Sequence, residues 1–394
     1  EKSLKQTIKK FHAAGLKVGM HMMTSLIGKN DPLVRPKPDP RLLKDASTTL
    51  AHDIDEAATS IAATDTIGAF AANQNRTKTY STPRIDIQVD NEIMRCEAPG
   101  PNNNHSFSDC RRGAYGTQAT PHKAGASINR LVQGAGAYLA DLKTSLKDQI
   151  AERVAEIFNE CGFDMIYFDG GELSRANKPG WYYVGQQQTA IGKRLKRDVL
   201  FQGSGMSHWL WHLLSRSACD DHAAIAVKSY LDHHKLKLLE HYRANFMPAE
   251  LGWCGLLAGG LDHPATTLAD IEHYGVRMIA FDSPISIQSN LKKLKNNKDT
   301  NIILDRIKQI DELRHSGKIS VPQRTHFKTG NWTLLDSSGK MVAHSIKAKS
   351  KQYWPESRMK QLEFPKERLI FKGEKLLAHS NLKGKKFRPG ALIC

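Results

Sequence analysis

The sequence predicts a mixed α/β protein: a (β/α)8 barrel that lacks its first strand, followed by a C-terminal β-sandwich domain. Two observations predict the barrel. An amphipathic helix, a glycine and a short apolar strand occur in this order three times, and the glycines of the second and third copies are 113 residues apart. This interval holds four strand–helix units of about 28 residues, close to the repeat of such a barrel. A third observation, the change to short strands near residue 318, predicts the sandwich.

Each copy of the repeated pattern places a polar residue at the end of its strand. The three strands end at His21, Asp169 and Asp282. In each copy the apolar helix residues are spaced by three and four, which puts them on one face. The glycine after each helix is typical of a left-handed cap that reverses the chain. If Asp169 ends strand four, Asp282 ends strand eight and His21 ends strand two. Strand one is then expected before residue 1, so the chain is predicted to be a fragment.

Residues 1–317 are predicted to form the barrel, with a long insertion at about 30–145 that helps to build the substrate cleft. The insertion is rich in proline and asparagine turns, and residues 82–93 alternate like a strand. A helix at 301–315 is expected to close the barrel. Further barrel strands are expected at residues 198–202, 209–214 and 244–247. A doubly wound sheet is the competing architecture, but no glycine-rich nucleotide fingerprint follows any of these strands.

Residues 318–394 are predicted to form a basic β-sandwich domain that the end of the chain truncates. Its strands are expected on both sides of an Asp-Ser-Ser-Gly turn within 332–346, and at 362–364, 368–371 and 376–378.

The net charge of +17 is concentrated in the last quarter of the chain. Residues 291–394 contain 24 basic and 9 acidic side chains, whereas residues 1–290 contain 33 and 31. Such a region is either a solvated basic surface or a binding surface for a polyanion such as a sulfated or uronic polysaccharide. No nucleic-acid-binding motif accompanies the charge, so nucleic acid is not an expected partner. The sequence has no apolar run of about 18 residues, so no membrane-spanning helix is expected.

The six cysteines include no Cys-x-x-Cys pair, and no metal site is expected. Cys96 and Cys110 flank a loop rich in proline and asparagine, and they are expected to form a disulfide if the protein is exported. Cys161 and Cys254 lie in apolar stretches and are expected to be buried.

Carboxylates at the ends of the predicted strands are the main candidates for catalytic groups. Residues 165–172 read Met-Ile-Tyr-Phe-Asp-Gly-Gly-Glu, so an apolar strand delivers Asp169 to its C-terminal end and Glu172 follows. Capping of the next turn by Asp169 is the structural alternative. Glycoside cleavage needs two carboxyl groups that flank the scissile bond, about 5–5.5 Å apart for retention of configuration. The candidate partners from other strand ends are Asp220, Asp221, Glu250 and Asp282.

Two segments of the barrel, residues 1–290, resemble α-galactosidase (melibiase)-type glycoside hydrolases. Residues 11–20, Phe-His-Ala-Ala-Gly-Leu-Lys-Val-Gly-Met, resemble the second strand of that family with the helix before it. Residues 161–169, Cys-Gly-Phe-Asp-Met-Ile-Tyr-Phe-Asp, are similar to its fourth strand. The resemblance implies that Asp169 is the catalytic nucleophile and that Asp220 or Asp221 is the acid/base. Such enzymes are commonly exported, so a periplasmic or extracellular location is favoured.

The resemblance has limits that leave other assignments open. Tyr167 replaces the lysine that the family carries two residues before its nucleophile, so galactose specificity does not follow. Barrel glycosidases that use carboxylates after strands four and seven would instead pair Glu172 or Asp169 with Glu250.

Several other side chains are expected to bind the substrate. Aromatic rings stack on the apolar faces of sugars, and an arginine binds a carboxylate or sulfate through two hydrogen bonds. With Glu172 and Asp282, the expected substrate-binding residues are His21, Arg216, Trp181 and Trp253.

The sequence therefore predicts a glycoside hydrolase that acts on an oligo- or polysaccharide, with retention through an aspartyl nucleophile and without a cofactor. The expected partner is a carbohydrate, and the basic C-terminal region allows an anionic one. Two alternatives stay open: a non-catalytic protein that binds a glycan or polyanion, and a polysaccharide lyase. A lyase would use Tyr167 or His21 as its base and Arg216 to neutralise the substrate.

Overall fold

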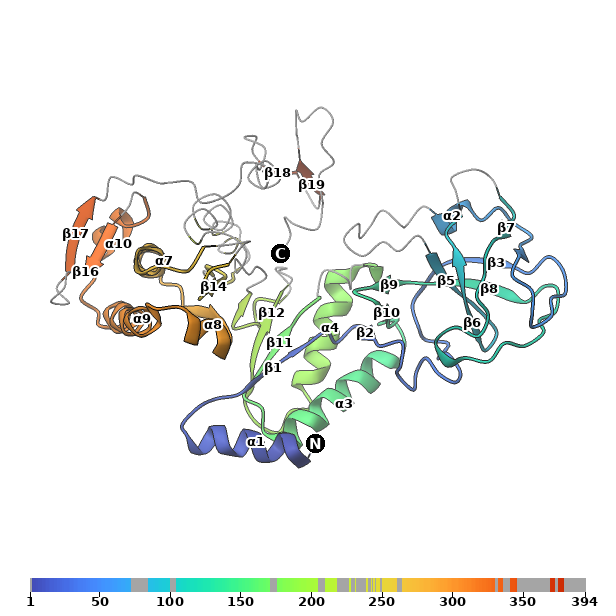
Figure 1. The fold of residues 1–394 in the computed structure, drawn as a ribbon, viewed down its shortest axis with the longest axis horizontal. Coiled ribbons are helices and arrows are strands. Elements are labelled where there is room, and N and C mark those ends of the chain that lie inside the picture. The colour runs from blue at the N-terminus through green and yellow to red at the C-terminus, as the bar shows by residue number, and fades with distance from the viewer. Residues whose placement is uncertain are drawn as a thin grey trace. The chain divides into compact units, whose positions relative to one another are not determined.

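The computed structural model divides the chain into two compact units, Glu1–Ser215 and Arg216–Pro389 (Figure 1). Each unit buries its own set of apolar side chains. The residues that the structure describes are 2–71, 84–99, 104–170, 176–204, 210–217, 227, 231, 239, 242, 244, 246–248, 250–260, 264–329, 332–335, 341–345, 369–372 and 375–378.

Unit 1 contains three parallel strands, β1 (Gly19–Met22), β11 (Met165–Phe168) and β12 (Leu200–Gly203). β11 lies between the other two, and Met165 is opposite both Gly19 and Leu200. Helix α1 (Lys2–Ala13) precedes β1, and α3 (Leu146–Cys161) precedes β11. The glycines that follow these helices, Gly15 and Gly162, adopt left-handed conformations with φ of 76° and 87°. The first two copies of the repeated pattern and the strand expected at 198–202 are therefore confirmed.

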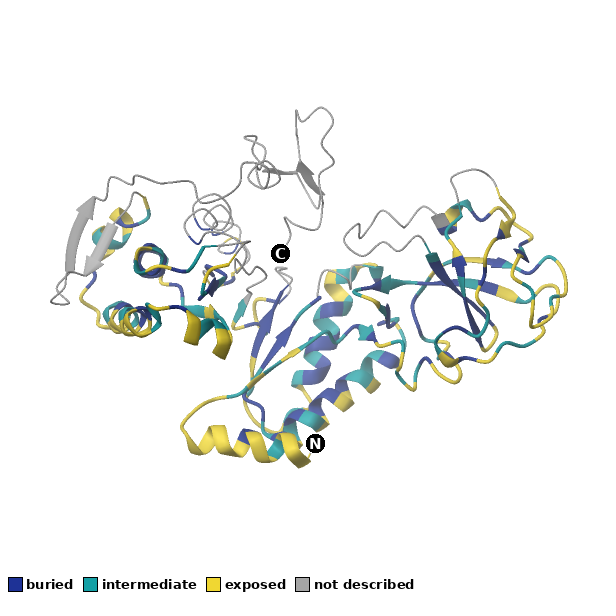
Figure 2. Cartoon of the chain, in the orientation of Figure 1, coloured by how far each residue is buried: buried dark blue, intermediate teal, exposed yellow. Residues whose placement is uncertain are grey.

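The two faces of these strands differ in character. Phe168 and Phe201 pack edge to face with ring centroids 5.1 Å apart, and the Phe201 ring approaches helix α4 (Gly180–Gly192). In Figure 1, α3 and α4 lie next to each other beside the strands, and Figure 2 shows buried residues along both helices. Since side chains alternate along a strand, His21, Tyr167 and Gln202 belong to the opposite face, where they form one row across the sheet.

One residue, Asp164, connects the starts of the three strands through its side chain and its backbone. Its side chain, 9% exposed, accepts hydrogen bonds from the Val18 N–H at 2.8 Å, from His12 Nε2 at 2.8 Å and from Arg197 Nη1 at 3.1 Å. Burial alone would raise the pKa of Asp164, but these hydrogen bonds outweigh it and hold that pKa well below its ordinary value of 3.8. The backbone oxygen of Asp164 also accepts the Leu200 N–H at 2.9 Å.

The insertion contains a four-stranded antiparallel sheet in the order β3–β8–β5–β6. These strands are β3 (Lys44–Thr49), β8 (Ser127–Leu131), β5 (Arg84–Val89) and β6 (Glu92–Glu97). The single strand expected at 82–93 is wrong, because β5 and β6 form a hairpin that turns at Asp90. Asp90 has a φ of 46°, a left-handed conformation that aspartate tolerates better than most residues.

The cysteine predictions are confirmed within the described residues. A disulfide joins Cys96 and Cys110, and Cys161 and Cys254 are free and buried. The remaining elements around the insertion are β2 (Leu26–Ile27), β4 (Ile61–Ala62), α2 (Gly68–Ala71), β7 (Ser106–Phe107), a 3-10 turn (Ala114–Gly116), β9 (Gln133–Gly134) and β10 (Ala137–Leu139).

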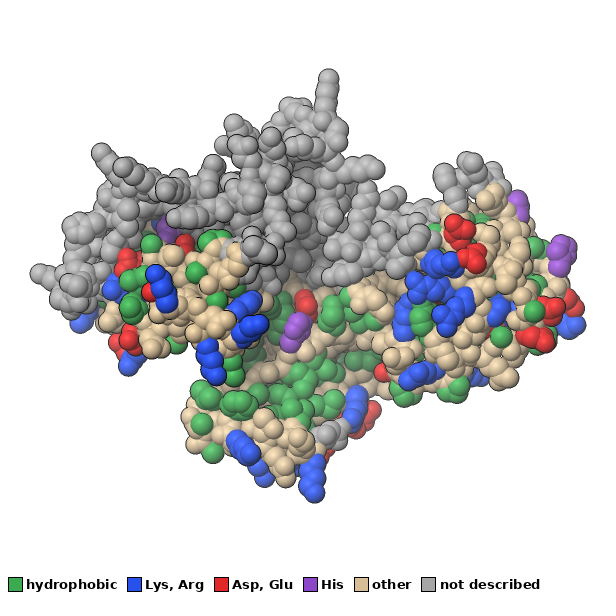
Figure 3. Space-filling model, viewed as in Figure 1, with side chains coloured by type: hydrophobic (Ala, Val, Ile, Leu, Met, Phe, Trp, Pro, Cys, Tyr) green, Lys and Arg blue, Asp and Glu red, His purple; other side chains and the backbone are tan. Residues whose placement is uncertain are grey.

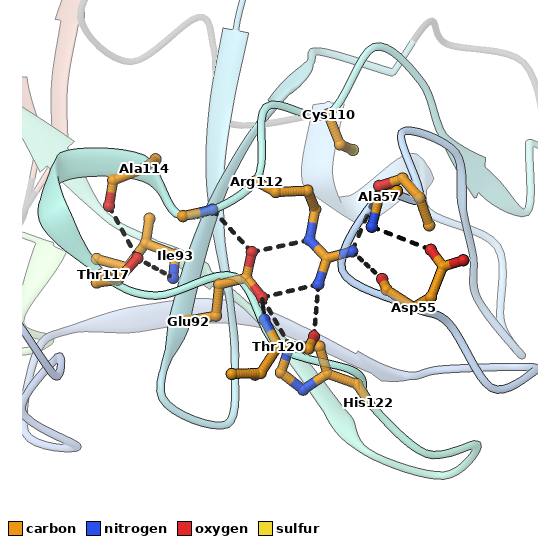
Figure 4. A network of polar contacts seen from close by, with 12 residues as sticks. Asp55, Ala57, Glu92, Ile93, Cys110, Arg112, Ala114, Thr117, Thr120 and His122 are labelled. Carbon is orange, nitrogen blue, oxygen red and sulfur yellow. Dashed lines mark hydrogen bonds and ion pairs between the residues drawn. The ribbon is translucent and has the colours of Figure 1, made fainter.

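Glu92 is the buried centre of a polar network in the insertion (Figure 4). Its carboxylate accepts two hydrogen bonds from Arg112, through Nε and Nη2 at 2.8 Å each. The Gly113 N–H at 2.8 Å and His122 Nε2 at 2.9 Å donate to it as well. Burial favours the neutral acid, but these donors prevail and lower the pKa of Glu92. We interpret the network as structural, because it ties β6 to residues 111–122.

In unit 2, the third copy of the repeated pattern does not have the predicted structure. Residues expected to form a helix, a glycine and a strand instead form one helix, α7 (Leu268–Phe281), in which residues 271–280 are all buried. Gly275 lies inside this helix, where a Cβ would come within 2.5 Å of Ile310 on helix α9 (Thr300–His315). The predicted strand at 276–281 is therefore wrong, and Asp282 caps a helix in the left-handed conformation with φ of 52°. The helix expected at 301–315 is confirmed.

The other expected strands have mixed outcomes. Residues 210–214 form a turn and Ala244 is helical, so the strands expected at 209–214 and 244–247 are wrong for the described residues. The C-terminal strands form two antiparallel hairpins, as predicted at 332–346, 368–371 and 376–378, whereas 362–364 lies outside the described residues. The elements are β13 (Arg216–Ser217), β14 (Trp253–Gly255), β15 (Ser286–Gln288), α8 (Leu291–Asn296), α10 (Val321–His326), β16 (Trp332–Leu335), β17 (Met341–Ser345), β18 (Leu369–Lys372) and β19 (Lys375–Ala378).

The described strands do not close into a barrel. Parallel pairing joins β1, β11 and β12 in unit 1, and β14 and β15 in unit 2. A mixed α/β architecture is therefore what the described residues show. Much of the basic C-terminal region lies outside them, and the described surface in Figure 3 carries acidic and basic side chains interspersed.

Candidate active site

The strongest candidate site combines Asp169 and His21 at the C-terminal ends of two neighbouring parallel strands. Asp169 follows β11 directly and its N–H donates to the Met22 carbonyl at 2.9 Å, which fixes the end of β11 against β1. His21 Nε2 lies 2.9 Å from Asp169 Oδ2, and the Gly170 N–H donates to Asp169 Oδ1 at 2.8 Å. The Asp169 and His21 side chains are 32% and 58% exposed. The carboxylate is therefore oriented by two hydrogen bonds and still open to a ligand.

The row of side chains beside this pair is polar and mostly buried. His21 and Tyr167 are in register, with ring centroids 5.1 Å apart at an interplanar angle of 61°. Gln202 lies opposite Tyr167 on β12 and is buried, and its Nε2 has no hydrogen-bond partner among the described residues. Just past the end of β12, Ser204 is buried and its N–H donates to the Phe168 carbonyl at 2.9 Å. Sequence reasoning did not select Gln202, although its register with Tyr167 follows from parallel pairing.

The chemistry open to Asp169 follows from its hydrogen bonds. A carboxylate offers about four lone-pair directions, and the Gly170 and His21 contacts occupy two of them. One oxygen can therefore attack an electrophilic carbon, or accept a hydroxyl hydrogen bond, while both contacts stay in place.

Three other predicted carboxylates lie outside the described residues: Glu172, Asp220 and Asp221. The site is therefore described without the distances from these three carboxyl groups to Asp169.

Glu250 and Arg216 lie together in unit 2. Glu250 is fully buried, Arg216 Nε donates to its Oε2 at 2.6 Å, and the Gly252 N–H donates to its Oε1 at 2.9 Å. Both oxygens of this buried carboxylate therefore already accept hydrogen bonds, which suits a structural ion pair. The sequence predicted both residues for the site, but not that they pair with each other.

The remaining predicted residues lie on separate elements. Asp282 pairs with Arg314 of α9 at 3.3 Å and with Arg324 of α10 at 3.2 Å, so it connects three helices of unit 2. Trp253 begins β14 and is half-buried. Trp181 lies in the first turn of α4 in unit 1 and is 40% exposed.

A second polar cluster, in the insertion, was not predicted from the sequence. Lys29 Nζ donates to Asp86 Oδ2 at 2.7 Å, to the Tyr115 hydroxyl at 2.9 Å and to Gln133 Oε1 at 2.7 Å. The buried Tyr138 also donates to Asp86 at 2.7 Å, and burial followed by the Asp86 charge raises its pKa well above the ordinary value. The only sequence signal is an aspartate within the strand pattern of β5. Because its members satisfy one another, we interpret this cluster as structural.

The described residues offer neither a metal site nor a membrane-spanning helix. They contain no group of three or more His, Cys, Asp or Glu side chains placed to hold a metal ion. Nor do they include a helix long and apolar enough to cross a membrane.

Comparisons with known proteins give remote structural likenesses. No protein-family model matches the sequence, and no curated protein matches it. Among solved structures, the galactosidase domain of an α-galactosidase–sucrose kinase has a TM-score of 0.41 and 12% identity, over 81% of this chain and 34% of that one. A family GH36 α-galactosidase from Geobacillus stearothermophilus has a TM-score of 0.40 and 11% identity, over 84% and 34%. An α-amylase from Geobacillus thermoleovorans has a TM-score of 0.41 and 13% identity, over 84% and 63%.

The chain thus spans about a third of the length of the α-galactosidases that it matches. TM-scores this low do not establish a shared fold.

Proposed function

We propose that the protein is a glycoside hydrolase that cleaves a glycosidic bond in an oligo- or polysaccharide, with Asp169 as its nucleophile. The observation that carries this proposal is the accessible Asp169 carboxylate at the C-terminal end of the central parallel strand, oriented by His21 and the Gly170 N–H. The resemblance of residues 161–169 to the fourth strand of melibiase-type enzymes supports the same role. We further propose that the parallel strands belong to a (β/α)8 barrel with a C-terminal β-sandwich.

In the proposed reaction, an Asp169 oxygen attacks the anomeric carbon while the bond to the leaving oxygen breaks and that oxygen takes a proton from the acid/base. The glycosyl ester on Asp169 is then hydrolysed by a water molecule, which gives its proton back to the same group. The configuration at the anomeric carbon is retained. His21 keeps the Asp169 carboxylate turned toward the face on which the sugar binds.

For the acid/base we propose Asp220 or Asp221, on the resemblance alone. Glu250 is the less suitable alternative, because its side chain is fully buried and both of its oxygens already accept hydrogen bonds, from Arg216 and from the Gly252 N–H. We also propose an exported location, supported by the disulfide between Cys96 and Cys110.

The test is hydrolysis of a panel of aryl α- and β-glycosides and of oligosaccharides by the 394-residue chain. Asp169→Asn is expected to lower kcat by ~10³-fold or more, because the amide is not a nucleophile. The matched control is Asp198→Asn, since Asp198 is an exposed aspartate near the other end of the strands. Equal activity of wild type and Asp169→Asn would overturn the proposal. So would products with an unsaturated uronic end, which a lyase makes, or binding of glycans with no turnover.

A further inference from the structure

A cavity of about 420 Å³ lies between helices α3 and α4 and the turn around residue 212. Its wall includes Trp181 and Tyr182 from the first turn of α4 and Lys147 from α3. None of the residues that line it contacts Asp169 or His21 in the hydrogen bonds described above. The cavity is therefore separate from the candidate active site, and its volume is within the range of small-ligand sites.

Two large aromatic side chains are unusually accessible at this cavity. Trp181 is 40% exposed and Tyr182 is 42% exposed. Their ring centroids lie 5.7 Å apart at an interplanar angle of 78°. Since the rings are nearly perpendicular, each presents a face in a different direction and they cannot sandwich one flat base. This arrangement suits a pyranose ring, whose apolar face packs on a single aromatic face.

The charges around the cavity are mainly positive. Lys147, Lys193 and Arg194 line it, and Asp148 is the one acidic residue among its described lining residues. Arg194 Nη2 lies 3.3 Å from Asp148 Oδ1, which neutralises one of the three cations. Lys147 Nζ donates to Gln186 Oε1 at 3.1 Å, and the exposed Lys193 has no side-chain partner among the described residues. Two ammonium groups are therefore left for an anionic ligand.

Uncharged hydrogen-bonding groups complete the site. Gln186 and Thr189 lie one turn apart on α4, and both line the cavity. Amides and hydroxyls of this kind pair with the hydroxyl groups of a sugar, whereas the ammonium groups pair with a sulfate or carboxylate. Aromatic faces, uncharged hydrogen-bonding groups and lysines without an acidic partner together fit a sugar that carries acidic groups.

We infer that this cavity is an auxiliary binding site for an anionic glycan, a sugar chain that carries sulfate or carboxylate groups. Trp181 and Tyr182 pack against the sugar rings, and Lys147 and Lys193 bind the acidic substituents. The inference does not depend on hydrolysis at Asp169. An auxiliary site of this kind would keep an anionic polysaccharide on the protein whether or not the bound segment is cleaved.

The experiment is isothermal titration of a chondroitin sulfate tetrasaccharide into the full chain. The Asp169→Asn variant is titrated in parallel, so that turnover does not consume the probe. Trp181→Ala, Tyr182→Ala and Lys193→Ala are each expected to weaken binding by about tenfold. The matched control is Lys196→Ala, because Lys196 is exposed in the same segment but does not line the cavity. It is expected to bind as wild type does.

Three results would overturn the inference. Unchanged binding in Trp181→Ala and Lys193→Ala would place the glycan elsewhere, and equal losses in Lys196→Ala would indicate unspecific charge attraction. Equal binding of neutral cellotetraose would remove the requirement for an anionic ligand. Circular dichroism of each variant shows that it is folded, so a loss of binding reports the site. Binding of the tetrasaccharide by a wild-type chain that hydrolyses none of the tested glycosides would contradict the proposed function and leave this inference standing.

Discussion

His21 Nε2 lies 2.9 Å from Asp169 Oδ2, although the two residues are 148 positions apart in the sequence. This contact follows from the parallel pairing of β1 with β11, which places His21 directly opposite Tyr167. Asp169 is two residues beyond Tyr167 along the same strand direction. The side chains of residues two apart along a strand lie on the same face. The imidazole and the carboxylate therefore meet at the C-terminal edge of the sheet, where enzymes built on parallel strands bind their substrates.

His21 is expected to act as a positioning residue for the Asp169 carboxylate. In His21→Ala we expect kcat to fall ~10²-fold with a smaller change in KM, because the nucleophile loses its orientation while the substrate contacts stay. The fold is expected to tolerate the change, since the His21 side chain is 58% exposed. His52→Ala, at another exposed histidine, is the control. Proportional losses of activity and of folded protein would assign His21 a merely structural role.

Asp164 is expected to stabilise unit 1 in a pH-dependent way. Its pKa in the folded protein is lowered, so its contribution is full above its unfolded value of 3.8 and is lost as the pH falls below 3.8 toward the folded value. We expect Asp164→Asn to lower the free energy of unfolding by about 1–3 kcal/mol at neutral pH and by less in acid. Urea unfolding at both pH values measures this. The same loss at both would show that the carboxylate charge is not the cause.

Gly275 is expected to be required for the packing of α7 on α9. In Gly275→Ala the gain in helix propensity is at most about 1 kcal/mol, whereas overpacking against the buried Ile310 costs about 1–3 kcal/mol. The cost of overpacking exceeds the gain in helix propensity, so we expect the Tm of Gly275→Ala to fall. It is expected to rise again when Ile310→Val, which removes the nearest methyl group, is added. Gly260→Ala is the control, because a Cβ there meets nothing within 4 Å. A Tm that rises in Gly275→Ala would contradict the close approach of the two helices.

The disulfide between Cys96 and Cys110 is expected to stabilise the insertion. It closes a loop with a sequence separation of 14, for which chain entropy predicts about 3 kcal/mol. We expect the double variant Cys96→Ala, Cys110→Ala to melt at a lower temperature than oxidised wild type and at about the same temperature as reduced wild type. Free thiols at both positions in protein from an oxidising compartment would count against the pairing.

Elements with strong local signals could be predicted from the sequence. The helices before β1 and β11 end at glycines that adopt the left-handed cap, and a short apolar strand follows each of them. In these segments the helix end, the reversal and the strand are encoded within a few residues, so pattern reasoning is sufficient. Asp169 and His21 could be selected for the same reason, as polar residues at the ends of apolar strands.

The structure of the third copy of the pattern could not be predicted from local sequence signals. Residues 271–280 are buried all around α7, so the mostly apolar stretch at 276–281 has no polar face and looks the same as a buried strand. The sequence pattern indicates a helix cap at Gly275, but the reason for a glycine there is the close approach of Ile310, which lies 35 residues away in the sequence. The pairing of Glu250 with Arg216 likewise depends on tertiary contacts that no local pattern carries.

The most direct test of the proposed function is covalent trapping of the enzyme with activated 2-deoxy-2-fluoro glycosides, followed by peptide mass spectrometry. The fluorine slows breakdown of the glycosyl ester, so a retaining enzyme accumulates labelled nucleophile. We predict a single sugar adduct on Asp169, which is absent in Asp169→Asn and present in the Asp198→Asn control. A label on a different carboxylate, or hydrolysis of the matching substrate without any adduct, would contradict the assignment of Asp169 as the nucleophile.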